Sequence, residues 1–171
     1  MELPQFKNTF NKPGIELLPH RDPFLFVDTL LSADETGAVG EYTFTNEKNA
    51  FFKGHFPDFP VVPGVILLEA MSQVAGASVV ARNVIGDQVA FAIAAFEDAK
   101  FRDPFRPGDK LVTVVTVVKE RAPLGVYMVK GYRNGEADKR GNPAVECTVK
   151  CMMGKALVEK KNAQGDAAGR E

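Results

Sequence analysis

The chain has 171 residues, of which 45% are hydrophobic and 25% are charged, and this composition is typical of one ordinary globular domain. Its 21 basic and 22 acidic residues give a formal net charge of −1. That balance excludes a general nucleic-acid binder and leaves only a local patch for a polyanion. No uncharged apolar run reaches the roughly 18–20 residues of a membrane span, since Glu69 interrupts the best candidate. Residues 1–13 lack a signal peptide, so we expect no membrane association and a cytoplasmic location.

The N-terminal part predicts two strands, one from Phe24 to about Leu31 and one from about Ala38 to Phe44, joined by a turn at 33–37. A proline- and glycine-rich loop follows, with the sequence FFKGHFPDFPVVPG. Residues 64–86 are then apolar nearly all round, which predicts a long helix buried on most sides. Pro63 suits the start of this helix and Gly86 its end.

Downstream the hydrophobic period changes to two, which predicts strands at about 89–101, 110–120, 124–134 and 144–158. The hairpin loops fall at 123–125 and 134–143. The charged, Ala/Gly-rich residues 159–171 lack large apolar side chains, and we expect a disordered tail. The sequence therefore predicts one α+β domain over 1–158, in which an antiparallel sheet wraps a central helix.

The two cysteines, Cys147 and Cys151, lie four residues apart in one predicted strand. That spacing separates them by roughly 13 Å, beyond the roughly 7 Å Cα limit of a disulfide. No histidine lies nearby to complete a zinc site. We therefore expect packed, reduced thiols and no metal.

Glu69 is the anomaly of the predicted helix, because its neighbours along the chain are apolar. Burying an ionised carboxylate without partners costs several kcal/mol, so such a residue is usually paired, protonated or functional. Gln73, four residues on, lies on the same face and could orient it. The alternative is that Glu69 reaches solvent at the helix edge. If it is buried, its raised pKa suits a proton donor.

His55 lies in the loop that three prolines stiffen, where an imidazole could act as a general base near neutral pH. A lone loop histidine can equally be structural. Gly64, at the expected helix start, could offer its N–H to a carbonyl oxygen. A base, an acid and an oxyanion donor within fifteen residues suit proton abstraction next to a carbonyl.

Three motifs stand in matching order within about residues 15–155. The first is the segment 18–28, with Leu18-Pro19-His20-Arg21, and the second is the segment 54–73, with Gly54-His55-Phe56-Pro57. The third is the segment 100–109, with Lys100-Phe101-Arg102. Together they resemble the 3-hydroxyacyl-(acyl carrier protein) dehydratases of the FabZ type. The resemblance implies a hot-dog fold and a homodimer, with a trimer of dimers as a further option. It implies a cofactor-free reaction on a substrate carried by acyl carrier protein.

By this resemblance His55 removes the C2 proton, and Glu69 of the other subunit protonates or positions the leaving 3-hydroxyl. Gly64 binds the thioester oxygen and Gln73 holds Glu69. Among the loop phenylalanines, Phe56 is a candidate for acyl binding or for packing. A hot-dog thioesterase is the alternative enzyme, with Glu69 activating water. A non-catalytic acyl-binding module is less compatible with an acid and a base that are both present.

The sequence leaves two interpretations open for His20 and for the basic residues at 100–106. His20 is expected to be a scaffold residue of a fixed loop, or else to line the site entrance. The basic residues Lys100, Arg102 and Arg106 are either a solvated hairpin edge or a landing patch for an acidic carrier protein.

Overall fold

A computed structural model of the protein describes residues 2–84 and 90–154. The elements in chain order are β1 (Asn8–Pro13), α1 (Gly14–Leu17), β2 (Thr29–Ala33), β3 (Gly37–Thr43), η1 (Ala50–Lys53), α2 (Gly64–Ala81), β4 (Ala90–Phe101), β5 (Lys110–Arg121), β6 (Leu124–Arg133) and β7 (Val145–Gly154). The expected tail 159–171, and the last four residues of the strand predicted at 144–158, lie outside the described residues.

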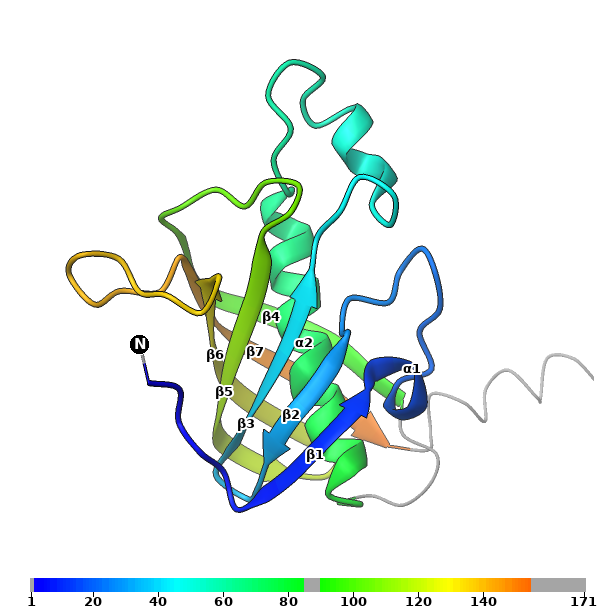
Figure 1. The fold of residues 1–171 in the computed structure, drawn as a ribbon. Coiled ribbons are helices and arrows are strands. Elements are labelled where there is room, and N and C mark those ends of the chain that lie inside the picture. The colour runs from blue at the N-terminus through cyan, green and yellow to red at the C-terminus, as the bar shows by residue number, and fades with distance from the viewer. Residues whose placement is uncertain (1, 85–89, 155–171) are drawn as a thin grey trace, which may run out of the picture.

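One antiparallel sheet of seven strands, in the order β1-β2-β3-β5-β6-β7-β4, curves around the long helix α2. Figure 1 shows α2 running through the hollow of this sheet, and it contacts every strand from β2 to β7. The face of the sheet that meets α2 supplies the fully buried side chains of the core, among them Leu30, Leu111, Val115 and Val129. The predicted α+β architecture, with an antiparallel sheet wrapped around one helix, is confirmed.

The N-terminal strands differ from the prediction. β1 was not predicted, because its residues are mostly exposed and show no apolar alternation. The strand expected from Phe24 begins only at Thr29. The backbone of residues 24–26 forms its hydrogen bonds with a side chain of α2 and not with a strand. The Phe26 amide donates to the Gln73 side chain at 2.7 Å, and the Phe24 carbonyl accepts from the Gln73 side chain at 3.0 Å. A helix side chain thus replaces a neighbouring strand as the partner of this segment.

The helix α2 ends at Ala81, five residues before the predicted stop at Gly86. Asn83 adopts the left-handed region at φ 54°. Its amide bonds to the carbonyl of Val80 at 2.9 Å, and the Val84 amide reaches that of Val79 at 3.2 Å. These two bonds form a Schellman motif, in which asparagine takes the place that glycine usually fills. The actual stop signal was therefore Asn83.

The helix α2 is long and apolar enough to cross a membrane by length and composition, which corrects the expectation that no such run exists. However, 67% of it is buried inside the sheet. Glu69 is the single charged residue among its 18 residues. The core position of α2 accounts for its apolar character.

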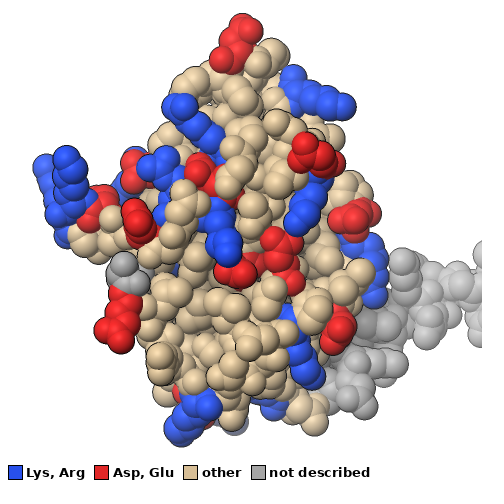
Figure 2. Space-filling model, in the orientation of Figure 1, with Lys and Arg blue, Asp and Glu red and all other residues tan. Residues whose placement is uncertain are grey.

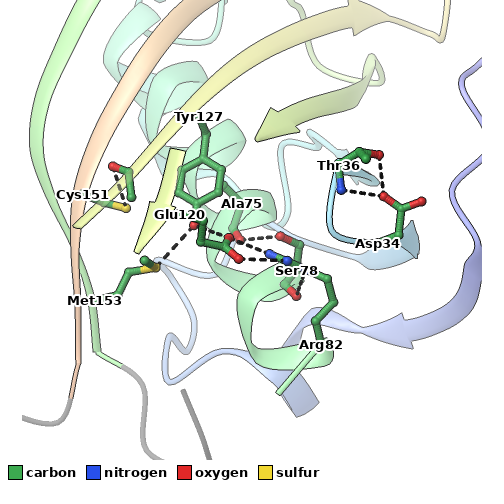
Figure 3. A network of polar contacts seen from close by, with 10 residues as sticks. Asp34, Thr36, Ala75, Ser78, Arg82, Glu120, Tyr127, Cys151 and Met153 are labelled. Atoms are coloured by element: carbon green, nitrogen blue, oxygen red, sulfur yellow. Dashed lines mark hydrogen bonds and ion pairs between the residues drawn. The ribbon is translucent and has the colours of Figure 1, made fainter. Parts of the chain in front are cut away.

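A buried polar network fastens the C-terminal end of α2 to the β5–β6 hairpin (Figure 3). The Arg82 guanidinium donates two hydrogen bonds to Glu120, at 2.9 and 2.7 Å, and the Tyr127 hydroxyl donates a third at 2.6 Å. The two charged side chains are only 9% and 12% exposed. Burial raises the pKa of Glu120, but the bonds from Arg82 and Tyr127 outweigh it and hold the pKa below its ordinary value.

We expect Glu120→Ala to lower the free energy of unfolding by about 3–5 kcal/mol, because it leaves the Arg82 charge buried without its carboxylate. Tyr127→Phe should lower it by about 1.5–3 kcal/mol through loss of one hydrogen bond to a charged group. Urea denaturation at fixed protein concentration measures both. The exposed Lys7–Glu35 pair provides the control, since Lys7→Ala should leave the urea midpoint unchanged. Equal losses in Glu120→Ala and Lys7→Ala would contradict this role for the network.

The two cysteines are free and buried on β7. Burial raises the pKa of Cys147 to about 11 and that of Cys151 to about 12. Both side chains therefore remain protonated thiols at neutral pH and are poor nucleophiles. The prediction of packed free thiols is confirmed.

Candidate active site

His55 follows η1, in a loop that stands clear of the sheet near the N-terminal end of α2 (Figure 1). Its backbone N–H donates to the Phe51 carbonyl at 2.9 Å, and its own carbonyl accepts from the Val61 amide at 2.9 Å. The Nδ1 atom of its ring lies 2.9 Å from the Val61 carbonyl oxygen. A carbonyl can only accept a hydrogen bond, so Nδ1 carries the proton and Nε2 keeps its lone pair. The loop therefore presents Nε2 as a base.

The phenylalanines of this loop divide into two groups. Phe52 is buried and Phe51 packs against the core, whereas Phe56 and Phe59 are 54% and 51% exposed. The Phe56 ring stacks on the His55 imidazole, with ring centroids 4.2 Å apart. Phe56 is thus placed beside the candidate base, and it has an open face.

Glu69 lies in the second turn of α2, with its side chain 19% exposed. The Gln73 Nε2 atom donates to its Oε1 at 2.8 Å. The Gln73 amide cannot turn over, because its oxygen already accepts from the Phe26 backbone N–H. The Glu69 carboxyl is therefore largely buried and held at one oxygen by a fixed donor. Of the two sequence interpretations, the structure favours the inward one over a solvent-exposed helix edge.

A cavity of about 100 Å³ lies beside the Glu69 carboxyl. It is lined by Leu18, His20, Glu69, Ser72, Gln73, Gly76, Phe91 and Ile93. Leu18, Phe91 and Ile93 form its apolar walls, and His20, Glu69 and Gln73 contribute polar groups, so the cavity has room for only a small part of a ligand. His20 is the residue whose role the sequence undervalued: its Nε2 atom lies 3.8 Å from the Glu69 Oε1. The sequence did contain an indication of this role, because His20 belongs to the motif 18–28, whose backbone Gln73 binds at Phe24 and Phe26.

Gly64 begins α2, as predicted. The first-turn N–H groups of a helix have no intrahelical acceptor, so its N–H can serve a ligand oxygen. The ring of Phe101 covers this position closely: a Cβ atom on residue 64 would lie 2.9 Å from the ring. A larger residue at position 64 would require the exposed Phe101 ring to move aside.

The described residues of one chain do not bring the candidate base and acid together. No hydrogen bond or ion pair among them joins His55 to Glu69, and His55 does not line the Glu69 cavity. The described residues thus place the two candidate groups apart, in two candidate half-sites, one with the His55 imidazole and one with the Glu69 carboxyl. Within these residues, no three His, Cys, Asp or Glu side chains gather as a metal-binding group.

The three candidate patch residues, Lys100, Arg102 and Arg106, differ in whether a carboxylate pairs with them. Lys100 and Arg102 pair with Glu146, at 3.7 and 2.6 Å, so one carboxylate offsets both. Arg106 instead lies over the Phe59 ring, 4.6 Å from its centroid, and pairs with no carboxylate in the part of the chain that the structure describes. On the face that Figure 2 shows, basic and acidic side chains are interspersed rather than gathered into one basic field.

A family model described as a FabA-like domain matches residues 18–138, which contain both half-sites. The chain belongs to this family. Its relatives include the 3-hydroxyacyl-(acyl carrier protein) dehydratase FabZ of Desulfotalea psychrophila, 41% identical over 69% of this chain and 79% of the relative. The enzyme of the same name from Polynucleobacter asymbioticus is 33% identical over 80% and 89%. These matches confirm the resemblance to FabZ-type dehydratases.

Superposition on solved structures shows which proteins share the fold of this chain. The dehydratase heterocomplex ApeI:P of Xenorhabdus doucetiae superposes with a TM-score of 0.72 at 14% identity, covering 88% of this chain and 98% of that one. A thioesterase superfamily member from Thermus thermophilus superposes with a TM-score of 0.58 at 17% identity, covering 80% and 95%. At these identities the likeness shows the hot-dog architecture, which dehydratases and thioesterases share.

Proposed function

We propose that this protein dehydrates 3-hydroxyacyl thioesters carried on acyl carrier protein to trans-2-enoyl thioesters, in fatty acid or related lipid biosynthesis. The observation that carries the proposal is the Glu69 carboxyl, held by Gln73 beside a small cavity with both apolar and polar walls. The dehydratase names of the relatives point to the same reaction.

In the proposed mechanism the His55 Nε2 removes the C2 proton, and the electron pair of the broken C2–H bond forms the C2–C3 double bond. The C3–O bond breaks as the acid, Glu69, gives a proton to the departing hydroxyl, which leaves as water. Gly64 donates its N–H to the thioester oxygen, where negative charge develops next to the acidified carbon. A proton then returns from His55 to Glu69, directly or through water, so the enzyme is regenerated without any cofactor.

The proposed active unit is a homodimer in which His55 of one subunit meets Glu69 of the other. The separation of the two half-sites within one chain supports this arrangement. The strand β4 ends the sheet and pairs only with β7 among the described strands. Its half from Phe96 to Phe101 is exposed, including both aromatic rings. Such an edge is suited to a second copy of the sheet. A trimer of dimers is compatible with the same contact.

Acyl carrier protein is the proposed partner, and Arg106 is the best placed of the three patch residues to meet an acidic carrier. Its charge has no acidic partner among the described side chains, and it stacks on Phe59 in the loop that carries His55. Lys100 and Arg102 would contribute less, because Glu146 already offsets them. The reaction and its partner imply a cytoplasmic location.

Product analysis tests the proposal. With a 3-hydroxyacyl group on acyl carrier protein, we expect an enoyl thioester, seen as a loss of 18 mass units on intact carrier, which is about one water. No free thiol should appear. A hot-dog thioesterase would instead release free acid and carrier thiol. Release of thiol at the rate of substrate loss would replace the dehydratase assignment with the thioesterase one.

A further inference from the structure

We propose that His20 is a positioning residue for Glu69, which fixes the carboxyl at Oε1 so that Oε2 carries the acidic proton. This inference rests on the proposed dehydration and assigns to the reaction a residue outside the His55, Glu69, Gly64 and Gln73 set. The two carboxyl oxygens of Glu69 are chemically equal, and His20 determines which of them faces the substrate.

The first observation is that two side chains converge on the same oxygen. Gln73 donates to Glu69 Oε1 at 2.8 Å, and His20 Nε2 lies 3.8 Å from that oxygen. The Gln73 orientation is fixed by the Phe26 amide, so its N–H is a donor in every protonation state of Glu69. An oxygen that accepts from a donor cannot also present its own proton in that direction. The neutral acid therefore carries its proton on Oε2.

The second observation concerns the tautomer of His20. Its Nδ1 atom is buried and has no hydrogen-bond partner among the described residues. A proton on Nδ1 would be a buried N–H without an acceptor, a group that native structures rarely contain. The proton of a neutral ring therefore sits on Nε2, where it faces Glu69 Oε1. Burial lowers the pKa of His20, which favours the neutral ring that a donor on Nε2 requires.

The third observation is that His20 and Gln73 belong to one clamp. The Gln73 amide bonds to the backbone of Phe24 and Phe26, just after His20 in the chain. The Arg21 guanidinium ties the same loop by donating to the carbonyls of Leu18 and His20, at 2.8 and 2.6 Å. The loop is thus fastened on both sides of the imidazole. His20 and Glu69 line the same cavity, so the fastened loop holds the imidazole on the side of the carboxyl that faces a ligand.

A set of three variants tests this role. The glutamine amide nitrogen of His20→Gln reaches the position of the imidazole Nε2, whereas that of His20→Asn reaches only the position of Nδ1. We expect His20→Ala and His20→Asn to lower kcat about 10–100-fold, the cost typical of losing a group that orients a reactive one. KM should stay within about threefold, and His20→Gln should recover kcat to within about fivefold of wild type.

Thermal unfolding and size-exclusion chromatography of each variant show whether the fold and assembly persist. If His20→Ala unfolds, the Gln and Asn pair still decides, since both keep a polar amide in the loop. Full kcat in His20→Asn, or equal kcat in the two amides, would overturn the inference. A wild-type enzyme that forms no enoyl product would instead overturn the proposed function, so the two failures are distinguishable.

Discussion

Replacing Glu69 with glutamine should lower kcat for dehydration by about 10²–10⁴-fold, the range for loss of a general acid. The substitution keeps the shape of the side chain and its contact with Gln73 at 2.8 Å, but removes the proton that the leaving hydroxyl needs. KM should change little, because the cavity walls are untouched. Stopped assays with mass detection of intact carrier protein measure the rate.

The exposed Glu16 of α1 provides a matched control, since Glu16→Gln makes the same chemical change outside the cavity. It should leave kcat and KM unchanged. Circular dichroism and chromatography verify that both variants remain folded and assembled. Full dehydratase activity in a folded Glu69→Gln variant would mean that another group protonates the hydroxyl.

The second large effect is expected for His55→Ala, which should lower kcat by at least about 10²-fold through loss of the base. The reason lies in the loop: the Val61 carbonyl holds the Nδ1 proton and leaves Nε2 free. His55→Gln should not rescue activity, because the lone pair of an amide nitrogen is delocalised into the carbonyl and is not basic enough to accept the C2 proton. This pattern is opposite to that expected at His20, where the amide of glutamine can replace a donor.

A solvent-exchange assay separates the two steps. In deuterated water, wild-type enzyme should catalyse exchange at C2 of the substrate whenever deprotonation is reversible, whereas His55→Ala should not. Exchange in His55→Ala at the wild-type rate would show that the C2 proton goes to a different base.

Much of this architecture follows from local sequence signals. The apolar stretch from Gly64 predicted the buried helix, and the period of two predicted the four strands that follow it. Motif spacing selected His55, Glu69 and Gln73, and the structure joins the last two directly. These features were accessible because helical periodicity and i, i+4 spacing are local properties.

The remainder depended on contacts between distant residues. The segment from Phe24 is extended but unpaired because Gln73, far along the chain, binds its backbone. The approach of His20 to Glu69 likewise depends on how this loop folds onto α2. The early end of α2 at Asn83 is different, since asparagine is a known left-handed C-terminal residue and the signal was present but weaker than the glycine beyond it.

The central claim is that one active site takes its base and its acid from two subunits, and subunit mixing tests it most directly. His55→Ala and Glu69→Gln proteins, each inactive alone, are mixed in equal amounts and allowed to exchange, with exchange verified by mass spectrometry of tagged chains. In a symmetric dimer, half of the assemblies are then mixed and each has one intact site, so we predict recovery to about a quarter of wild-type activity. No recovery despite verified exchange would contradict the shared site.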